Sequence, residues 1–392
     1  MPNALQSRLD ALDAKSPERT GRLVDLVLAE AVRSGASDVH FEPTNHSLDV
    51  RFRLDGFLQH VAALNRDLAP NVIARLKVMA ELLTYRQDIP QEGRLANGQA
   101  QFGVDMRIST FPTIHGEKAA IRIFGAGAAI LDLDQLGFAP ALLDDLRSLF
   151  QQRSGAIFLT GPSGSGKTTT LYACLRHLLR ECRGGRHIVT IEDPVEQVLE
   201  GVSQSQARPG TEFDFARGLR SLLRQDPEII MVGEVRDSDT AHIAIQAALT
   251  GHLLLSTLHA GSSCGVISRL LEMGMETYLL TSGLKGIVNQ RLVRRLCEAC
   301  RRRTDDGWDA PGCEQCFGAG YRGRLLLAEL VLMDDALRQA ILGRADTLAL
   351  ERCAAQSGRL TIRNAAEHAL AQGWTSHVEV TRVLGPIERR TQ

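Results

Sequence analysis

Residues 161–168 read Gly-Pro-Ser-Gly-Ser-Gly-Lys-Thr, and they carry the strongest signal for the fold. It fits the pattern GxxxxGK[ST], in which glycines let backbone N–H groups surround the phosphates of a nucleotide. An apolar run, 156–159, precedes it, and leucines at helical spacing follow at positions 171, 175, 178 and 179. A chance glycine-rich turn would not have this strand before it and this helix after it. The order of strand, phosphate loop and helix therefore predicts a nucleotide-binding α/β domain.

The chemistry of the loop assigns roles within it. Lys167 is expected to reach the β- and γ-phosphates, and the Thr168 hydroxyl is expected to ligate Mg²⁺. The predicted nucleotide contacts are Gly161, Pro162, Ser163, Gly164, Ser165, Gly166, Lys167, Thr168 and Thr169.

Three further apolar runs, 188–191, 229–232 and 253–255, are typical of buried parallel strands. They end in Glu192-Asp193, in Gly233-Glu234 and in a segment that reaches His259. Ligands bind at the carboxyl edge of a parallel sheet, so these polar groups are predicted to line the nucleotide site. One strand that ends in an acid is usually followed by a solvated loop, but three in one nucleotide fold favour function.

Gly233 occupies the position at which such folds commonly carry a Mg²⁺-binding aspartate. Two divisions of labour remain open at this stage. Either Glu234 polarises the attacking water while Thr168 and waters hold the metal, or Glu192 and Asp193 share the task.

The remaining chain divides by pattern. Residues 1–20 are polar with scattered leucines and predict a short, loosely attached helix. Residues 21–124 predict a small α+β domain with a largely antiparallel sheet. Its elements are helices from Leu23 and over roughly 70–83, a hairpin that turns at Asp55-Gly56, and strands over 102–108 and 121–123. A Gly/Ala-rich linker (125–138), an α/β P-loop core (139–290), a zinc-binding insertion (291–330) and a helical C-terminal subdomain (331–392) follow.

Composition excludes several classes of protein. Among 392 residues, 45 Lys and Arg nearly balance 46 Asp and Glu, so no global basic field favours nucleic acid or membranes. Eight cysteines are too few for a disulfide scaffold, the N-terminus does not resemble a signal peptide, and no apolar run is long enough to span a bilayer. These features predict a cytoplasmic protein with reduced thiols.

Four of the cysteines form two CxxC pairs, Cys297/Cys300 and Cys313/Cys316, with twelve residues between them. This spacing suits a structural tetrahedral Zn²⁺ site, because four thiolates leave no open coordination position. Redox disulfides are the alternative, which a reducing cytoplasm and the doubled motif disfavour.

An arginine patch is also predicted around the first CxxC pair, from Arg291, Arg294, Arg295 and Arg301 to Arg303. Anionic lipid, an acidic tail of a membrane partner, nucleic acid or plain solvent could face it.

The motifs together resemble the signature segments of the secretion ATPases of the type II secretion and type IV pilus assembly class. In the core these are GPSGSGKTTTLY (161–172), TIEDPVE (190–196), IIMVGEVRD (229–237) and LTGHLLLSTLHA (249–260). In the N-terminal domain they are ASDVHFEP (36–43), QEGR (91–94), VDMRIS (104–109) and PTIHGEKAAIR (112–122). The four-cysteine insertion is similar to that of assembly members, whereas retraction ATPases lack one.

The resemblance implies that the P-loop core (139–290) is RecA-like and forms a homo-hexamer, in which ATP binds between the core and the preceding domain. It implies that Glu234 is the catalytic glutamate, with Glu192 and Asp193 beside it. His252 and His259 would respond to the γ-phosphate or to a subunit contact. Arg94 and Arg107 would supply cationic contacts to the phosphates; the alternative is that both are ordinary surface arginines.

The leading hypothesis is a cytoplasmic hexameric motor that hydrolyses ATP to drive pseudopilus assembly and protein export by a type II secretion system. It would work at the inner membrane through platform proteins. A type IV pilus assembly ATPase is the alternative within the class. A nucleic-acid motor is disfavoured by the neutral charge and the lack of clustered stacking aromatics. A nucleotide-binding scaffold that does not hydrolyse would be consistent with Gly233.

Overall fold

The protein is described here from a computed structural model, which describes residues 4–13, 16–95, 101–124, 132–182, 185–208 and 210–386. These residues form two compact units. The first unit holds the part up to Phe124 together with Arg294–Arg303 and Asp309–Gly323, and the second holds the rest. The predicted linker lies outside the described residues as far as 131; beyond that, Leu133–Gln135 forms a short 3-10 turn.

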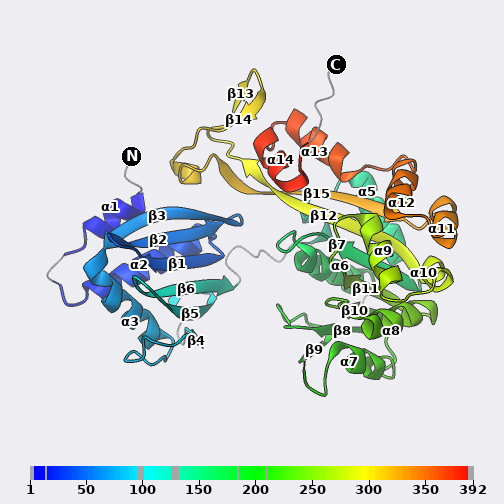
Figure 1. The fold of residues 1–392 in the computed structure, drawn as a ribbon, viewed down its shortest axis with the longest axis horizontal. Coiled ribbons are helices and arrows are strands. Elements are labelled where there is room, and N and C mark those ends of the chain that lie inside the picture. The colour runs from blue at the N-terminus through cyan, green and yellow to red at the C-terminus, as the bar shows by residue number, and fades with distance from the viewer. Residues whose placement is uncertain are drawn as a thin grey trace. The chain divides into compact units, whose positions relative to one another are not determined.

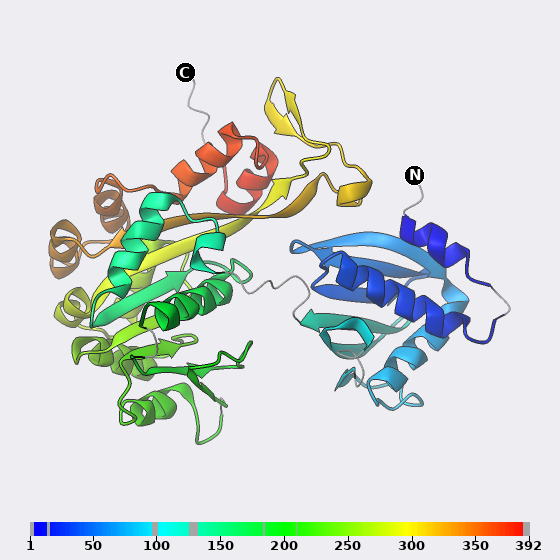
Figure 2. The same ribbon diagram turned by 180° about the vertical axis from the view of Figure 1, so that it is seen from behind.

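The first unit is built on a six-stranded sheet in the order β3-β2-β1-β6-β5-β4, with every resolved pairing antiparallel. Helix α2 lies across one face of this sheet (Figure 2). The strands are β1 (Asp38–Pro43), β2 (Ser47–Leu54), β3 (Phe57–Asn65), β4 (Gln91–Arg94), β5 (Asp105–Thr113) and β6 (Gly116–Phe124). The helices are α1 (Ala4–Asp10), α2 (Arg19–Arg33) and α3 (Ala69–Met79), with a 3-10 turn at Arg66–Leu68.

The predicted hairpin is confirmed. Residues of β2 are buried alternately, and both Asp55 (φ +50°) and Gly56 (φ +86°) adopt the left-handed conformation that a two-residue hairpin turn requires. Three expectations differ from the structure. The N-terminal helix α1 is not loosely attached, because Leu5 and Leu9 are each 2% exposed within the core of the first unit. Strand β5 begins at Asp105 rather than at residue 102, and helix α3 ends at Met79 rather than near residue 83.

The second unit is built on a seven-stranded sheet in the order β15-β12-β7-β11-β10-β8-β9. The five pairings from β12 to β9 are parallel, as the buried apolar runs predict. Its strands are β7 (Gly155–Thr160), β8 (Ile188–Glu192), β9 (Ser203–Gln206), β10 (Ile229–Val232), β11 (Leu253–Thr257), β12 (Leu284–Leu296) and β15 (Tyr321–Leu332).

Helices cover both faces of this sheet (Figures 1 and 2). Alternate strand residues point to opposite faces: Ile157 and Leu159 pack with the leucines of α5 and α6, whereas Ala156 and Phe158 pack with α8 and α9. The helices are α5 (Pro140–Phe150), α6 (Lys167–Cys182), α7 (Phe215–Leu222), α8 (Ser238–Leu249), α9 (Ser263–Glu272) and α10 (Thr277–Gly283).

The region after the core departs from the predicted insertion. Strands β12 and β15 belong to the large sheet and continue beyond it, and the segment between them carries the short strands β13 (Arg302–Thr304) and β14 (Gly307–Asp309) and the 3-10 turn Glu314–Cys316. We call residues 294–303 and 309–323, which carry the four paired cysteines, the cysteine module; they group with the first unit. The predicted C-terminal helices are present as α11 (Asp335–Leu342), α12 (Thr347–Ala355), α13 (Ile362–Ala371) and α14 (His377–Leu384).

Candidate functional site

The phosphate loop follows the fully buried strand β7. Gly161 (φ +142°), Gly164 (φ +74°) and Gly166 (φ +89°) have backbone conformations that L side chains avoid. A Cβ on Gly161 would lie 2.4 Å from the Gln290 carbonyl oxygen, so the loop also needs glycine for space. Lys167 Nζ donates to the carbonyls of Gly161 (2.8 Å) and Pro162 (3.0 Å), and burial lowers its pKa. The loop is therefore closed around its own lysine.

A cleft of about 390 Å³ opens beside this loop, at the carboxyl edge of the sheet. Of the predicted nucleotide contacts, Ser163, Gly164, Gly166, Lys167, Thr168 and Thr169 line it, while Gly161, Pro162 and Ser165 complete the loop without lining the cleft. Of the predicted acids and bases, Glu192, Asp193, Glu234 and His259 line the same cleft. The ends of three parallel strands thus meet there as the sequence predicts.

Glu192 ends β8 and is 3% exposed. Its Oε1 accepts from the Thr190 hydroxyl (2.6 Å) and from Gln204 Nε2 (3.0 Å), and its Oε2 accepts from the Tyr172 hydroxyl (2.5 Å). Burial, together with this carboxylate, raises the pKa of Tyr172 well above its ordinary value, so the hydroxyl remains a donor. Both oxygens of Glu192 are thus committed to fixed donors inside the protein.

Glu234 follows β10 and has a different environment. Its side chain is 19% exposed, and Oε2 contacts Arg236 while Oε1 lies 3.3 Å from His259 Nε2. The hydrogen bond to Glu234 raises the pKa of Arg236. Asp193, next to Glu192, is exposed at the mouth of the cleft. A carboxylate at the cleft wall with an imidazole beside it can orient or deprotonate a water molecule.

The two predicted histidines lie at opposite ends of the same strand. His259 follows the carboxyl end of β11 and reaches Glu234. His252 precedes Leu253 at the amino end, where its Nδ1 lies 2.9 Å from the Ala247 carbonyl. The structure therefore places His252 at the edge of the sheet away from the phosphate loop, and only His259 joins the cleft.

The two predicted arginines belong to the first unit. Arg94 on β4 and Arg107 on β5 are register partners, and Arg107 is in turn the partner of Arg122 on β6. Three exposed guanidinium groups thus form a row across adjacent strands. Arg94 Nη2 donates to Asp105 (2.6 Å), and Arg107 lies over the Phe124 ring (5.4 Å). Arg122 extends the predicted pair and was not singled out by its motif.

Sequence reasoning also missed Arg236 and Arg324, both of which line the cleft. Arg236 lies inside the motif IIMVGEVRD, two residues after Glu234, so the motif itself could have indicated it. Arg324 comes from β15, which lies at the far edge of the sheet order from β10, and no local pattern indicates its position.

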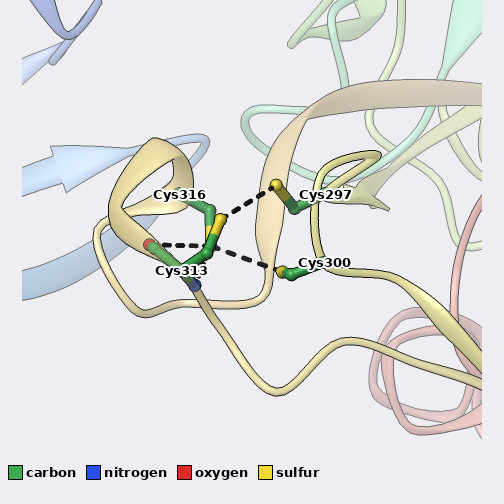
Figure 3. A group of neighbouring side chains, drawn as sticks. All are labelled: Cys297, Cys300, Cys313 and Cys316. Carbon is green, nitrogen blue, oxygen red and sulfur yellow. Dashed lines mark hydrogen bonds between the residues drawn. The ribbon is translucent and has the colours of Figure 1, made fainter.

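The four cysteines of the module come together (Figure 3), with their Sγ atoms all within 4.8 Å of one another. Three of the separations, Cys297–Cys313, Cys300–Cys316 and Cys313–Cys316, are 3.8, 3.9 and 3.8 Å. A tetrahedron of sulfurs about 2.3 Å from a central Zn²⁺ has edges of about 3.8 Å. The backbone N–H groups of Cys313 and Gly320 donate to Cys316 Sγ, as suits a thiolate. The donor set fits a four-coordinate metal.

Three arginines of the predicted patch are held by separate partners. Arg291 is half-buried in the second unit and donates to the Gly261 carbonyl (2.7 Å). Arg294 is stacked between the rings of Phe57 (3.6 Å) and Tyr321 (3.9 Å), and Arg295 pairs with Glu298 (2.7 Å). Neighbours in sequence alternate between faces of an extended strand, which gives these three arginines different partners. Arg302 and Arg303 are exposed, and the lipid contact predicted from the patch stays a prediction.

The sequence profile of the family described as Type II/IV secretion system protein matches residues 13–382. Type II secretion system protein E of Klebsiella pneumoniae is 43% identical over 391 residues, covering 95% of this chain and 78% of that protein. Type II secretion system ATPase E of Vibrio cholerae is 41% identical over 391 residues, covering 95% of this chain and 77% of that protein.

Solved structures share the fold. The Legionella pneumophila ATPase DotB superposes with a TM-score of 0.70 at 21% identity, covering 95% of this chain and 98% of that one. The pilus retraction motor PilT, solved with ADP, gives a TM-score of 0.60 at 24% identity, covering 94% and 98%. Among the helices that the structure describes, none combines the length and the apolar character needed to cross a bilayer. The profile match and the sequence identities show that the chain belongs to the Type II/IV secretion system protein family, a family of secretion ATPases.

Proposed function

We propose that this chain is a cytoplasmic ATPase that hydrolyses ATP to drive pseudopilus assembly, and with it protein export, in a type II secretion system. The observation that carries the proposal is the pairing of Glu234 with His259 in the cleft of the phosphate loop. The relatives named type II secretion system proteins support the biological role.

The cleft assigns the steps of hydrolysis. Backbone N–H groups of the phosphate loop and Lys167 Nζ would bind the phosphates, for which Lys167 exchanges its two carbonyl partners. Thr168 would hold Mg²⁺, which supplies charge neutralisation between the β- and γ-phosphates. Glu234 would orient the attacking water and accept its proton, and His259 would hold the carboxylate in place.

Glu192 and Glu234 differ in their hydrogen bonds and in their exposure, and this difference assigns their roles. A general base needs a lone pair that water can reach. Glu192 is 3% exposed and accepts three hydrogen bonds, from Tyr172, Thr190 and Gln204. Glu234 is 19% exposed at its side chain and contacts Arg236 and His259, so more of its carboxylate is open to water. We therefore assign Glu192 to anchoring the loop that carries Asp193, and Glu234 to the chemistry.

Two further parts of the proposal come from the family resemblance. Arg94 and Arg107 would offset the negative charge that develops on the transferred phosphate, within a homo-hexamer. Partners would be platform proteins of the inner membrane. His252, which lies away from the cleft, would serve a subunit contact.

The cysteine module would hold Zn²⁺ through Cys297, Cys300, Cys313 and Cys316. Four thiolates complete the tetrahedron, so the metal would be structural and take no part in hydrolysis.

Glu234→Gln and Glu192→Gln in the full chain test the proposal. Glu234→Gln should lower kcat about 10²–10⁴-fold with ADP binding retained, because it removes the base but not the phosphate contacts. Glu192→Gln should act mainly on stability: the free energy of unfolding should fall, while kcat per folded molecule should change little. An ATPase rate stimulated strongly by DNA, and by neither vesicles nor platform proteins, would instead indicate a nucleic-acid motor. Restoration of secretion, rather than of piliation, in strains that lack the corresponding ATPase would separate the two systems of the class.

A further inference from the structure

Residues His259–Ser263, which we call the histidine loop, begin just after β11 and end at the first residue of α9. His259 contacts Glu234, and each of the next four residues is held by a different element of the second unit. The Ala260 N–H donates to the Thr160 hydroxyl (3.1 Å), which itself donates to the Ala260 carbonyl (3.2 Å). Thr160 ends β7 directly before the phosphate loop, so these bonds connect the two loops at their bases.

The rest of the histidine loop is held from the C-terminal side of the fold. The Gly261 carbonyl accepts from Arg291 Nη2 (2.7 Å). The Ser262 hydroxyl donates to Glu351 on α12 (2.6 Å), and the Ser263 hydroxyl donates to Glu329 on β15 (2.7 Å). Glu329 also accepts from the first N–H of α13 (Ile362, 2.9 Å).

Arg291 is the contact that reaches both loops. Its Nη1 donates to Asn289 Oδ1 (2.6 Å) and to the Gln290 carbonyl (3.0 Å). That carbonyl lies against Gly161: a Cβ on Gly161 would lie 2.4 Å from its oxygen and 3.2 Å from Arg291 Nη1. One planar guanidinium therefore spans from the base of the phosphate loop to the backbone of the histidine loop, a geometry that its fork of donors suits.

Apolar packing does not replace these contacts. A cavity of about 430 Å³ lies on the side of the histidine loop that faces α12 and α13, and Gly261, Ser262, Ser263, Arg291 and Glu329 line it. Ala260 packs against the hydrophobic core on the other side, but on the cavity side the loop, which carries His259, is held by its polar bonds.

We propose that Arg291 is a positioning residue for ATP hydrolysis, which holds the histidine loop, and through it His259 on Glu234, in register with the phosphate loop. This inference rests on the proposed function, since it assigns Arg291 a part in the same reaction. Arg291 is not among the residues that line the nucleotide cleft, so its proposed effect on Glu234 passes through the histidine loop.

The test compares Arg291→Ala, Arg291→Lys and His259→Ala in the full chain, with Arg269→Ala as the control. Arg269 is exposed on α9, the helix that follows the loop, and pairs only at the surface with Glu272 (3.2 Å). Arg291→Ala should lower kcat about 10- to 100-fold, the scale of a misplaced catalytic group, while the Kd for a fluorescent ADP analogue stays within about twofold. Arg291→Lys keeps the charge but has one short donor group for two distant carbonyls, so its kcat should fall between wild type and Arg291→Ala. Arg269→Ala should match wild type.

The double variant His259→Ala/Arg291→Ala decides whether Arg291 acts through the loop. It should be no slower than His259→Ala alone, because the second substitution removes support from a group that is already gone. The inference is overturned if the losses in kcat of the two single variants multiply in the double variant, or if Arg291→Ala has the kcat of wild type. If Arg291→Ala does not fold, Arg291→Lys takes its place in the same comparison. If wild type does not hydrolyse ATP, the proposed function itself fails. If wild type is active but His259→Ala is fully active too, the role given to His259 fails and the inference with it. Full activity of Arg291→Ala alone removes only the inference.

Discussion

Replacing Tyr172 by phenylalanine tests the buried hydrogen bond that fixes Glu192. The tyrosine is 4% exposed and its hydroxyl donates to Glu192 Oε2 at 2.5 Å. Phenylalanine has almost the same shape, so the change creates no cavity and the loss is polar. A hydrogen bond to a charged group contributes about 1.5–3 kcal/mol. The hydroxyl also accepts from the N–H groups of Glu196 and Gln197, but both residues are exposed and their amides regain water. We therefore expect the free energy of unfolding to fall by about 1.5–3 kcal/mol.

Urea unfolding followed by tryptophan fluorescence measures this change. The chain has two tryptophans, Trp308 and Trp374, and both belong to the second unit, so the signal follows the unit that contains Tyr172. Tyr278→Phe is the matched control, because Tyr278 is 56% exposed and its hydroxyl also bonds a glutamate, Glu276. A loss no larger than that of the control would refute the reasoning. The double variant Tyr172→Phe/Glu192→Gln should lose less than the sum of the two single losses, because both substitutions remove the same bond.

Other predictions follow from single contacts. Wild type should release one Zn²⁺ per chain when it is denatured in the presence of a metal-binding dye. Purified Cys297→Ser should release none, because three thiolates leave the tetrahedron incomplete. Equal amounts of metal in both proteins would exclude this site. Gly312→Ala should lower the zinc content and speed proteolysis of the cysteine module, because its Cβ would lie 2.3 Å from the Gly318 carbonyl at a φ of +98°. Gly21→Ala, within α2 and with its nearest non-local atom at 3.9 Å, should instead stabilise the chain by about 0.5–1 kcal/mol, measured as a rise in Tm. Arg94→Ala and Arg107→Ala should each lower kcat at saturating ATP while leaving ADP affinity unchanged; unaltered turnover would return both to the status of surface arginines.

Much of the nucleotide fold could be predicted from the sequence because its signals are local. The phosphate loop, the four apolar runs and the polar residues that end them each lie within a few residues, and the parallel sheet brings those ends together. The hairpin at Asp55-Gly56 and the four cysteines were predictable for the same reason.

The parts that sequence reasoning missed depend on distant contacts. In β12 the apolar residues are interrupted by Lys, Gln and Arg, and the apolar residues 325–328 and 330–332 of β15 lie at the end of the predicted insertion; only the assembled sheet shows that both strands join it. Glu192 and Glu234 look alike as acids at strand ends. Their difference comes from Tyr172 and Gln204, which other elements bring to Glu192. His252 and His259 share one motif, yet the five residues of β11 lie between them. At about 3.3 Å per residue, this strand places the two histidines at opposite edges of the sheet.

The way the cysteine module joins the first unit limits how the protein can be cut. Its residues lie far beyond the first sheet in sequence, yet Arg294 stacks on Phe57 and the Gly323 N–H donates to Asp55 (2.7 Å). A fragment that ends at Phe124 would leave Phe57 and Asp55 without these partners, and the complementary fragment would carry the module without the hairpin on which it packs. The two compact units are therefore not two separable genetic segments. Biochemical work on either unit calls for the whole chain, with point variants in place of truncations.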